Sequence, residues 1–239
     1  MRLHAFWVSK MNSFLDSNVL LNYIFVLDKQ HVQSEEIIFR SVNYYSPRVK
    51  DEVDEAFIKK NKEYKCFIFG VDEFVNKFPD QYMINNLAVH GLITNLRPAG
   101  RFKRGQMHDA FDRLWEKFEF GEAHDAFEVK SKFNKFRDEF QFLHQLRKDS
   151  LYNKMILVPN HVKKDRKILD LIKAKNLREE LLHYSDENIL FDANEFAEDN
   201  KELDLEFVTA DQNFYKAINI LMDYLSFDKC INLMEFSNS

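Results

Sequence analysis

Short apolar runs followed by an acidic residue and an amphipathic stretch occur near both ends of the chain. Residues 13–15 have the pattern of a buried strand that stops at Asp16, and the apolar stretch 19–27 that follows is typical of a helix. Near the other end, residues 205–209 form a similar strand, Asp211 follows it, and an amphipathic helix begins shortly afterwards. The pattern predicts two strand, acid and helix units far apart in the sequence.

Three more short apolar runs complete a set of five predicted strands: residues 41–45, 154–159 and 230–236. Helical periodicity occupies the segments between strands, for example residues 163–183 and 185–197. This alternation predicts an α/β fold with a central, mostly parallel five-stranded sheet flanked by helices.

The middle of the chain follows a different pattern. From about residue 66 to 150 it is rich in charges and has phenylalanines at helical spacing, which is typical of a helical bundle. We expect an inserted helical lobe with helices at residues 70–77, 81–90, 107–118 and 120–148. The whole chain, residues 1–239, is then a single domain with a core of residues 1–65 and 151–239.

Two strand ends and one helix supply candidate carboxylates. Asp16 and Asp211 each follow a strand, and the carboxyl edge of a parallel sheet is where ligands bind. Ser46 and Pro47 are typical of a helix start, as N-cap and first helical residue. Glu52 lies on that helix at roughly 85° from the centre of its apolar stripe, so it is the nearby acid expected to reach the sheet.

The predicted helix at residues 185–197 supplies a further acid. Asp186 lies about 20° from the centre of the apolar stripe, in the first turn, where the helix dipole favours an ionised carboxylate. Asp192 lies about 100° from the centre of the stripe, so it faces the core less directly than Asp186. Four carboxylates are therefore predicted to converge: Asp16, Glu52, Asp186 and Asp211.

A cation-rich loop separates two predicted helices of the lobe. Arg97, Arg101, Lys103 and Arg104 lie there with a phenylalanine, on a stretch that also contains proline and glycine. Such a loop suits phosphate contact and base stacking in RNA binding, and a solvated turn is the alternative reading.

Composition limits the class of protein. Hydrophobic residues make up 45% and charged residues 31% of the 239, as in a globular protein and unlike a disordered chain. Two cysteines without CxxC spacing do not form a disulfide framework. No apolar run reaches the roughly 18 residues of a membrane span, and no signal-peptide pattern begins the sequence, so we expect a cytoplasmic location. The net charge of -5 argues weakly against a nucleic-acid coat protein but not against a nuclease with an acidic pocket.

Four segments of the sequence resemble the PIN domain family. They are FLDSN at residues 14–18, Glu52 after its Ser-Pro turn, Asp186 before Ile-Leu-x-x-Ala, and FVTxD at residues 207–211. The resemblance covers about residues 8–64 and 151–239 and excludes the lobe. It implies a PIN-like three-layer fold and the activity typical of that family, a divalent-metal-dependent ribonuclease, as found in toxins of toxin–antitoxin pairs and in RNA-processing enzymes.

The resemblance also implies roles for individual residues. Asp16, Glu52, Asp186 and Asp211 would be both the catalytic residues and the ligands of Mg²⁺ or Mn²⁺, cations that prefer hard oxygen donors. The side chains implied to orient these carboxylates, to contact substrate or to act as alternate ligands are Asn18, Asp192, Thr209 and Asn213.

The helical lobe is where this sequence departs from the PIN domain family. The lobe has no counterpart in the compact toxins, so we expect it to act as a substrate clamp for single-stranded or structured RNA or as a partner platform. Two other functions stay open, a catalytically silent PIN-like module that binds RNA or protein, and a structure-specific DNA nuclease with the same metal site. An antitoxin-like partner also stays open. So does a homodimer, although the sequence carries no dimer signal such as heptads.

Overall fold

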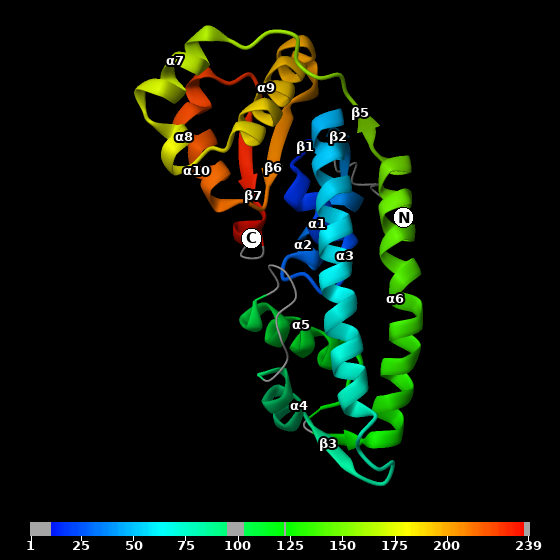
Figure 1. Ribbon diagram of the computed structural model, residues 1–239. Helices are drawn as coiled ribbons and strands as arrows, with labels where there is room; N and C mark the ends of the chain where they lie inside the picture. The colour runs from blue at the N-terminus through cyan, green and yellow to red at the C-terminus, as the bar shows by residue number, and fades with distance from the viewer. Residues whose placement is uncertain (1–10, 95–102, 122, 237–239) are drawn as a thin grey trace, which may run out of the picture. The chain divides into compact units, whose positions relative to one another are not determined.

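The structure, a computed structural model, describes residues 11–94, 103–121 and 123–236 (Figure 1). The chain divides into two compact units. We call them the sheet unit (Met1–Tyr23, Val32–Val53 and Leu151–Ser239) and the helical unit (Ile24–His31 and Asp54–Ser150).

The sheet unit contains a five-stranded sheet with the order β5-β2-β1-β6-β7. Every neighbouring pair in it is parallel. This confirms the predicted α/β fold with its central sheet flanked by helices, and the sheet is parallel throughout. The strands are β1 Met11–Leu15, β2 Ser41–Tyr45, β5 Ile156–Leu157, β6 Leu205–Thr209 and β7 Lys229–Asn232.

Helices connect these strands in the way that parallel pairing requires. Their bounds are α1 Ser17–Ile24, α2 His31–Arg40, α3 Pro47–Val75, α6 Ala126–Lys154, α7 Arg166–Ala174, α8 Leu177–Glu180, α9 Tyr184–Asp199, α10 Gln212–Leu221 and α11 Leu233–Phe236, with 3-10 turns at Lys201–Leu203 and Met222–Tyr224. Of these, α3 and α6 continue into the helical unit.

Aromatic side chains form the core on one face of the sheet. Phe14 of β1 stacks on Phe207 of β6, with ring centroids 5.8 Å apart. Phe207 also contacts Phe214 of α10 at 5.3 Å, and Tyr44 of β2 contacts Phe196 of α9 at 4.9 Å. Because Phe14, Tyr44 and Phe207 are register partners, they share this face, which α9 and α10 cover.

The strand order reverses beside β1. From β1 the chain first adds β2 and β5 on one side and later adds β6 and β7 on the other. In open α/β sheets the crevice at the carboxyl ends of such a pair of strands is the usual ligand site. The ends of β1 and β6 therefore define the part of the fold where a function is expected.

Three predicted elements of the sheet unit differ from those observed. The strand predicted for residues 230–236 ends at Asn232, whose Oδ1 accepts a hydrogen bond from the Met234 N–H at 2.9 Å and so starts the α11 turn. The helix predicted for residues 163–183 is interrupted at Asn176, which has a left-handed φ of 52°. The strand predicted at residues 154–159 is reduced to β5, because Lys154 still belongs to α6.

The helical unit packs parts of α3 and α6 with α4 (Asn86–Ile93) and α5 (Arg104–Lys117). Figure 1 shows α3 and α6 side by side, and the rings of Tyr64 and Phe140 join them at 6.2 Å. A two-stranded antiparallel sheet, β3 (Met83–Asn85) and β4 (Ala123–Asp125), replaces the starts of two predicted helices. The Ala126 N–H extends that pairing by donating to the Tyr82 carbonyl at 2.8 Å.

Of the helices within the described residues, none combines the length and the apolar character that crossing a bilayer requires.

Candidate functional site

Four carboxylates come from four different elements of the sheet unit. Asp16 directly follows β1, and Asp211 caps α10 two residues after β6. Because β1 and β6 are adjacent and parallel, these two residues lie at the same edge of the sheet. Asp186 lies in the first turn of α9, and Glu52 lies in the second turn of α3, which begins where β2 ends.

The four side chains are close enough to interact through their charges. Asp16 is affected by the negative charges of Asp186 and Glu52, and Asp186 by those of Glu52 and Asp211. The structure therefore brings together the four carboxylates that the sequence singled out. Like charges at such separations repel, so this grouping costs folding free energy unless a proton or a cation joins it.

Asp16 is the most buried of the four, with 1% of its surface exposed. Its Oδ2 accepts hydrogen bonds from the Thr209 hydroxyl at 2.8 Å and from Asn18 Nδ2 at 3.4 Å, and its Oδ1 accepts from the Ser17 N–H at 2.7 Å. Burial raises the pKa of Asp16 to about 7, and the charges of Asp186 and Glu52 add to the rise, while the Thr209 bond opposes it.

Asp186 and Asp211 have local hydrogen bonds as well. Asp186 Oδ2 accepts from the His183 N–H at 3.0 Å, which completes a capping box at the start of α9. Burial raises the pKa of Asp186 to about 6, against the lowering effect of that hydrogen bond. Asp211 Oδ1 accepts from the N–H groups of Asn213 and Phe214 at 2.7 and 3.0 Å and so caps α10.

The surroundings of Asp16 differ from those of the other buried acids. Five of these acids each contact a lysine or an arginine: Asp28 with Lys60, Asp72 with Arg137, Glu187 with Lys164 and Arg178, Asp192 with Arg48, and Glu206 with Lys229. Asp16 is equally buried, but its partners in the described part of the chain are a hydroxyl, an amide and backbone or side-chain groups of Ser17. A buried carboxylate with only neutral donors and with acidic neighbours is destabilised in its ionised form, and a nearby positive charge would stabilise it.

Three residues predicted to assist the carboxylates lie beside them. Thr209 donates to Asp16 and accepts from the Asp211 N–H at 3.0 Å, so it links the two strand-end acids. Asn18 is exposed and donates to Asp16, and Asn213 is exposed and donates its backbone N–H to Asp211. Thr209 and Asn18 are thus positioned to orient Asp16. Asn213, in contrast, contributes its backbone N–H to the cap that Asp211 forms.

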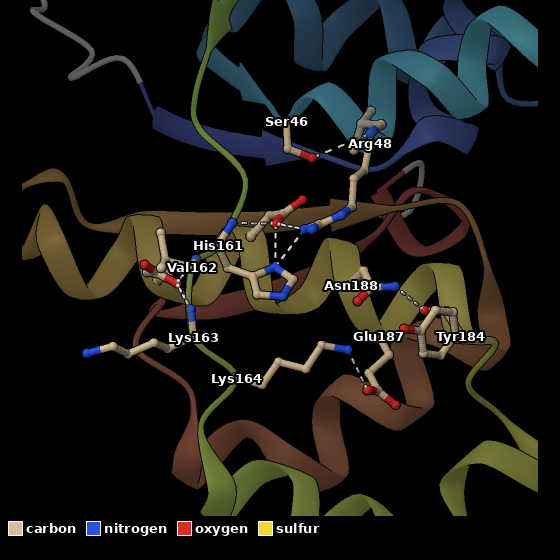
Figure 2. A network of polar contacts seen from close by, with 12 residues as sticks. Ser46, Arg48, His161, Val162, Lys163, Lys164, Tyr184, Glu187 and Asn188 are labelled. Atoms are coloured by element: carbon tan, nitrogen blue, oxygen red, sulfur yellow. Dashed lines mark hydrogen bonds and ion pairs between the residues drawn. The ribbon is translucent and has the colours of Figure 1, made fainter.

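Asp192 has a different set of contacts. Its Oδ1 accepts from the guanidinium of Arg48, from the His161 N–H at 2.8 Å, and contacts His161 Nδ1 at 2.6 Å (Figure 2). The loop containing His161 continues along α9, where the N–H groups of Val162 and Lys163 donate to Glu195. Asp192 therefore ties this loop and the start of α3 to α9, which is a structural role.

The predicted RNA-binding loop is described only in part. Arg97 and Arg101 lie outside the described residues. Lys103 and Arg104 are exposed at the N-terminus of α5, where the Lys103 N–H donates to Gln106 Oε1 at 2.9 Å. Their exposure is compatible with phosphate contact and equally with a solvated helix start.

Among the described residues, no group of three or more His, Cys, Asp or Glu side chains has the arrangement of a metal-binding group. The helix caps explain this, because the Asp186 and Asp211 carboxylates are turned toward the N–H groups of their own helices. The carboxylates of Asp186 and Asp211 are thus both engaged in helix capping.

Sequence reasoning missed two neighbours of the acids. Ser17 donates to Asp16 from its N–H, and His183 lies close enough to Asp186 for its charge to favour the ionised carboxylate. Both are adjacent or nearly adjacent in sequence to a predicted acid. The sequence around both residues is typical of a helix start. That pattern occurs at ordinary helix caps and at functional sites alike, so it does not distinguish the two.

Comparison with known proteins identifies no relative: no protein-family model, no curated protein and no solved structure matches this chain.

Proposed function

We propose that this chain is a divalent-metal-dependent endoribonuclease that cleaves RNA phosphodiester bonds with Asp16, Glu52, Asp186 and Asp211. The observation that carries the proposal is Asp16, a fully buried carboxylate at the strand-reversal edge of the sheet that has acidic neighbours and neutral hydrogen-bond donors. Perturbed acids of this kind mark functional sites, because folding alone gains nothing by keeping them unpaired.

The chemistry of the donor set fits Mg²⁺ or Mn²⁺. All four candidate ligands are carboxylates, and hard oxygen donors are what these cations prefer. A cation beside Asp16 would offset both its burial and its repulsion from Asp186 and Glu52. When bound, such a cation activates water and neutralises phosphate oxygens.

The residues of the chain contribute position and charge. Thr209 donates to Asp16 Oδ2 at 2.8 Å and accepts from the Asp211 N–H at 3.0 Å, so one hydroxyl links the two strand-end acids. Asp211 uses Oδ1 for its helix cap, and its Oδ2 takes part in no hydrogen bond in the described part of the chain. Glu52 comes from α3 and Asp186 from α9, and their charges would add to the attraction for the cation.

The test is cleavage of mixed single-stranded and hairpin RNA and DNA in Mg²⁺ or Mn²⁺ by the wild type, Asp16→Asn and Asp211→Asn. Asp211→Asn removes the charge and keeps the oxygen that caps α10. Asp16→Asn removes the charge and keeps one acceptor oxygen, so it also changes the hydrogen bonds on one side of Asp16, with Ser17 or with Thr209 and Asn18. We expect RNA cleavage to fall by at least about 100-fold in both variants. The matched control is Asp223→Asn, an exposed acid in the 3-10 turn after α10, at the opposite edge of the sheet, which should cleave like the wild type.

Other outcomes separate the alternatives. Metal-dependent cleavage of DNA without cleavage of RNA would show that the chain is a DNA nuclease and not a ribonuclease. No cleavage of either nucleic acid would contradict the nuclease and favour a module that binds RNA or protein.

A further inference from the structure

An exposed tyrosine lies in the same helical turn as one of the candidate acids. Tyr184 is the first residue of α9, two positions before Asp186, and 71% of its surface is exposed. Its backbone carbonyl accepts from Asn188 Nδ2 at 2.9 Å, so the turn that carries the ring is fixed. An aromatic ring left this exposed gives the fold little stabilisation by burial and is available to a ligand.

A buried ion-pair network lies directly behind this ring. Glu187 is fully buried and accepts from Lys164 Nζ at 3.0 Å and from Arg178 Nε at 2.7 Å. The Lys164 ammonium also lies over the Tyr184 ring, 5.0 Å from its centroid, and over the buried ring of Phe191, at 5.4 Å. Figure 2 shows Lys164, Glu187 and Tyr184 together at this end of α9.

The network holds two cations beside an exposed ring. Arg178 keeps part of its guanidinium in solvent, since 44% of its side chain is exposed, and it lies near Tyr184. Replacing Glu187 and its partners by apolar residues would cost the fold little, because buried ion pairs are close to neutral for stability. What the network provides is a fixed position for Lys164 and Arg178 next to Tyr184.

An unpaired nucleotide matches this arrangement. Its base offers a flat ring that stacks on an aromatic side chain, and its phosphates are attracted to neighbouring cations. A base inside a duplex has both faces covered by its neighbours, so a surface of this kind selects single strands. A second exposed tyrosine, Tyr224, provides the contrast: it is 50% exposed, and within the described residues no cation lies over its ring.

We propose that Tyr184, backed by Lys164 and Arg178, is a stacking platform for an unpaired base of single-stranded RNA, at the same end of α9 as Asp186. This proposal rests on the proposed nuclease function, because it assigns part of the substrate's binding surface at the same edge of the sheet. It names the substrate class as single-stranded and unstacked near the cleavage point.

The test measures binding and cleavage separately. Binding of a fluorescently labelled single-stranded RNA, and of the duplex of the same sequence, is measured by anisotropy in the full chain carrying Asp16→Asn with Mg²⁺ present. Adding Tyr184→Leu should weaken single-strand binding by about 5- to 150-fold, the range for loss of one stacked base, and leave duplex binding unchanged. Tyr184→Phe keeps the ring and should bind within about twofold of its parent, as should the matched control Tyr224→Leu.

The two proposals can fail separately. If wild type cleaves RNA and Tyr184→Leu binds single strands as its parent does, the platform is overturned and the nuclease stands. If no RNA is cleaved but Tyr184→Leu alone loses single-strand binding, the platform stands and the nuclease falls. Equal losses for Tyr184→Leu and Tyr224→Leu, or no RNA binding at all, would also overturn the platform.

Discussion

The helical unit and the carboxyl edge of the sheet around Asp16 treat buried charge in opposite ways. In the helical unit, the buried carboxylate of Asp28 is bonded to Lys60 and to the Tyr64 hydroxyl at 2.6 Å, and Asp72 accepts from Arg137 at 2.6 Å. In the sheet unit, Asp16 is buried among acids with neutral donors. The buried acids of the helical unit therefore serve its own structure, as do the paired buried acids elsewhere in the sheet unit. Asp16 differs from all of them, because none of its hydrogen-bond partners among the described residues is a cation.

The comparison predicts that removing the charge of Asp16 stabilises the folded protein when metal is absent. Its pKa is about 7 in the folded protein against an ordinary 3.8, so the unfolded chain releases this proton first as the pH rises. The stabilising contribution of protonated Asp16 is fully present below pH about 4. It decreases as the pH rises and is lost as the pH passes about 7. At pH about 8 in EDTA, Asp16→Asn should exceed the wild type by up to about 4 kcal/mol in urea unfolding.

Asp223→Asn is the control for that measurement, since its carboxylate is exposed. An Asp16→Asn variant that is less stable than the wild type at alkaline pH would contradict the expected gain from removing the buried charge and would remove the contrast between Asp16 and the paired buried acids.

In the helical unit, removing one charge of a buried ion pair should lower stability rather than raise it. Lys60→Met leaves the buried carboxylate of Asp28 without its cation, which should lower the free energy of unfolding by roughly 2 to 3 kcal/mol. The neighbouring Lys59 pairs with Glu55 at 2.7 Å, but both side chains are mostly exposed. Lys59→Met should therefore change stability by less than about 0.5 kcal/mol in the same chemical denaturation experiment. Equal effects of the two substitutions would mean that burial of Asp28 does not matter.

The pH dependence of the helical unit should also run against that of the sheet unit. His144 is buried among Phe25, Tyr64 and Phe140, and burial lowers its pKa from 6.5 to about 3. The stability that its neutral form supports is complete above pH about 6.5 and is lost as the pH falls towards 3. At pH near 5 the loss is about 2 kcal/mol.

His144→Phe, which keeps an aromatic ring at this position, should remove that part of the acid sensitivity. The measurement is the change in denaturation midpoint between pH about 8 and pH about 5, for the variant and the wild type. The same change in both proteins would show that His144 is protonated in the folded state.

The fold was predictable because its signals are local. Each parallel strand is a short apolar run, and the acid after β1 or β6 marks where the chain turns into a helix. The grouping of Asp16 and Asp211 follows from topology alone once β1 and β6 are known to be parallel. Glu52 and Asp186 were predicted from their helical-wheel positions. A helical wheel shows which way a side chain points from its own helix.

The ion pairs were not predictable, because their partners are distant in sequence. Arg48 and Asp192 are 144 residues apart, and the helical wheel placed Asp192 at the side of α9. In the structure the loop containing His161 covers that side, so Asp192 is buried there. Lys164 and Tyr184 likewise meet only through the packing of the loop on α9. Periodicity carries no information on such contacts.

The most direct test of the account is calorimetric titration of Mn²⁺ into the metal-free protein at pH about 8, where Asp16 is ionised. We expect a saturable heat in the wild type, the same heat in Asp223→Asn, and its loss in Asp16→Asn. No saturable heat in the wild type, or the same heat in Asp16→Asn, would contradict the claim that the buried carboxylate is part of a cation site.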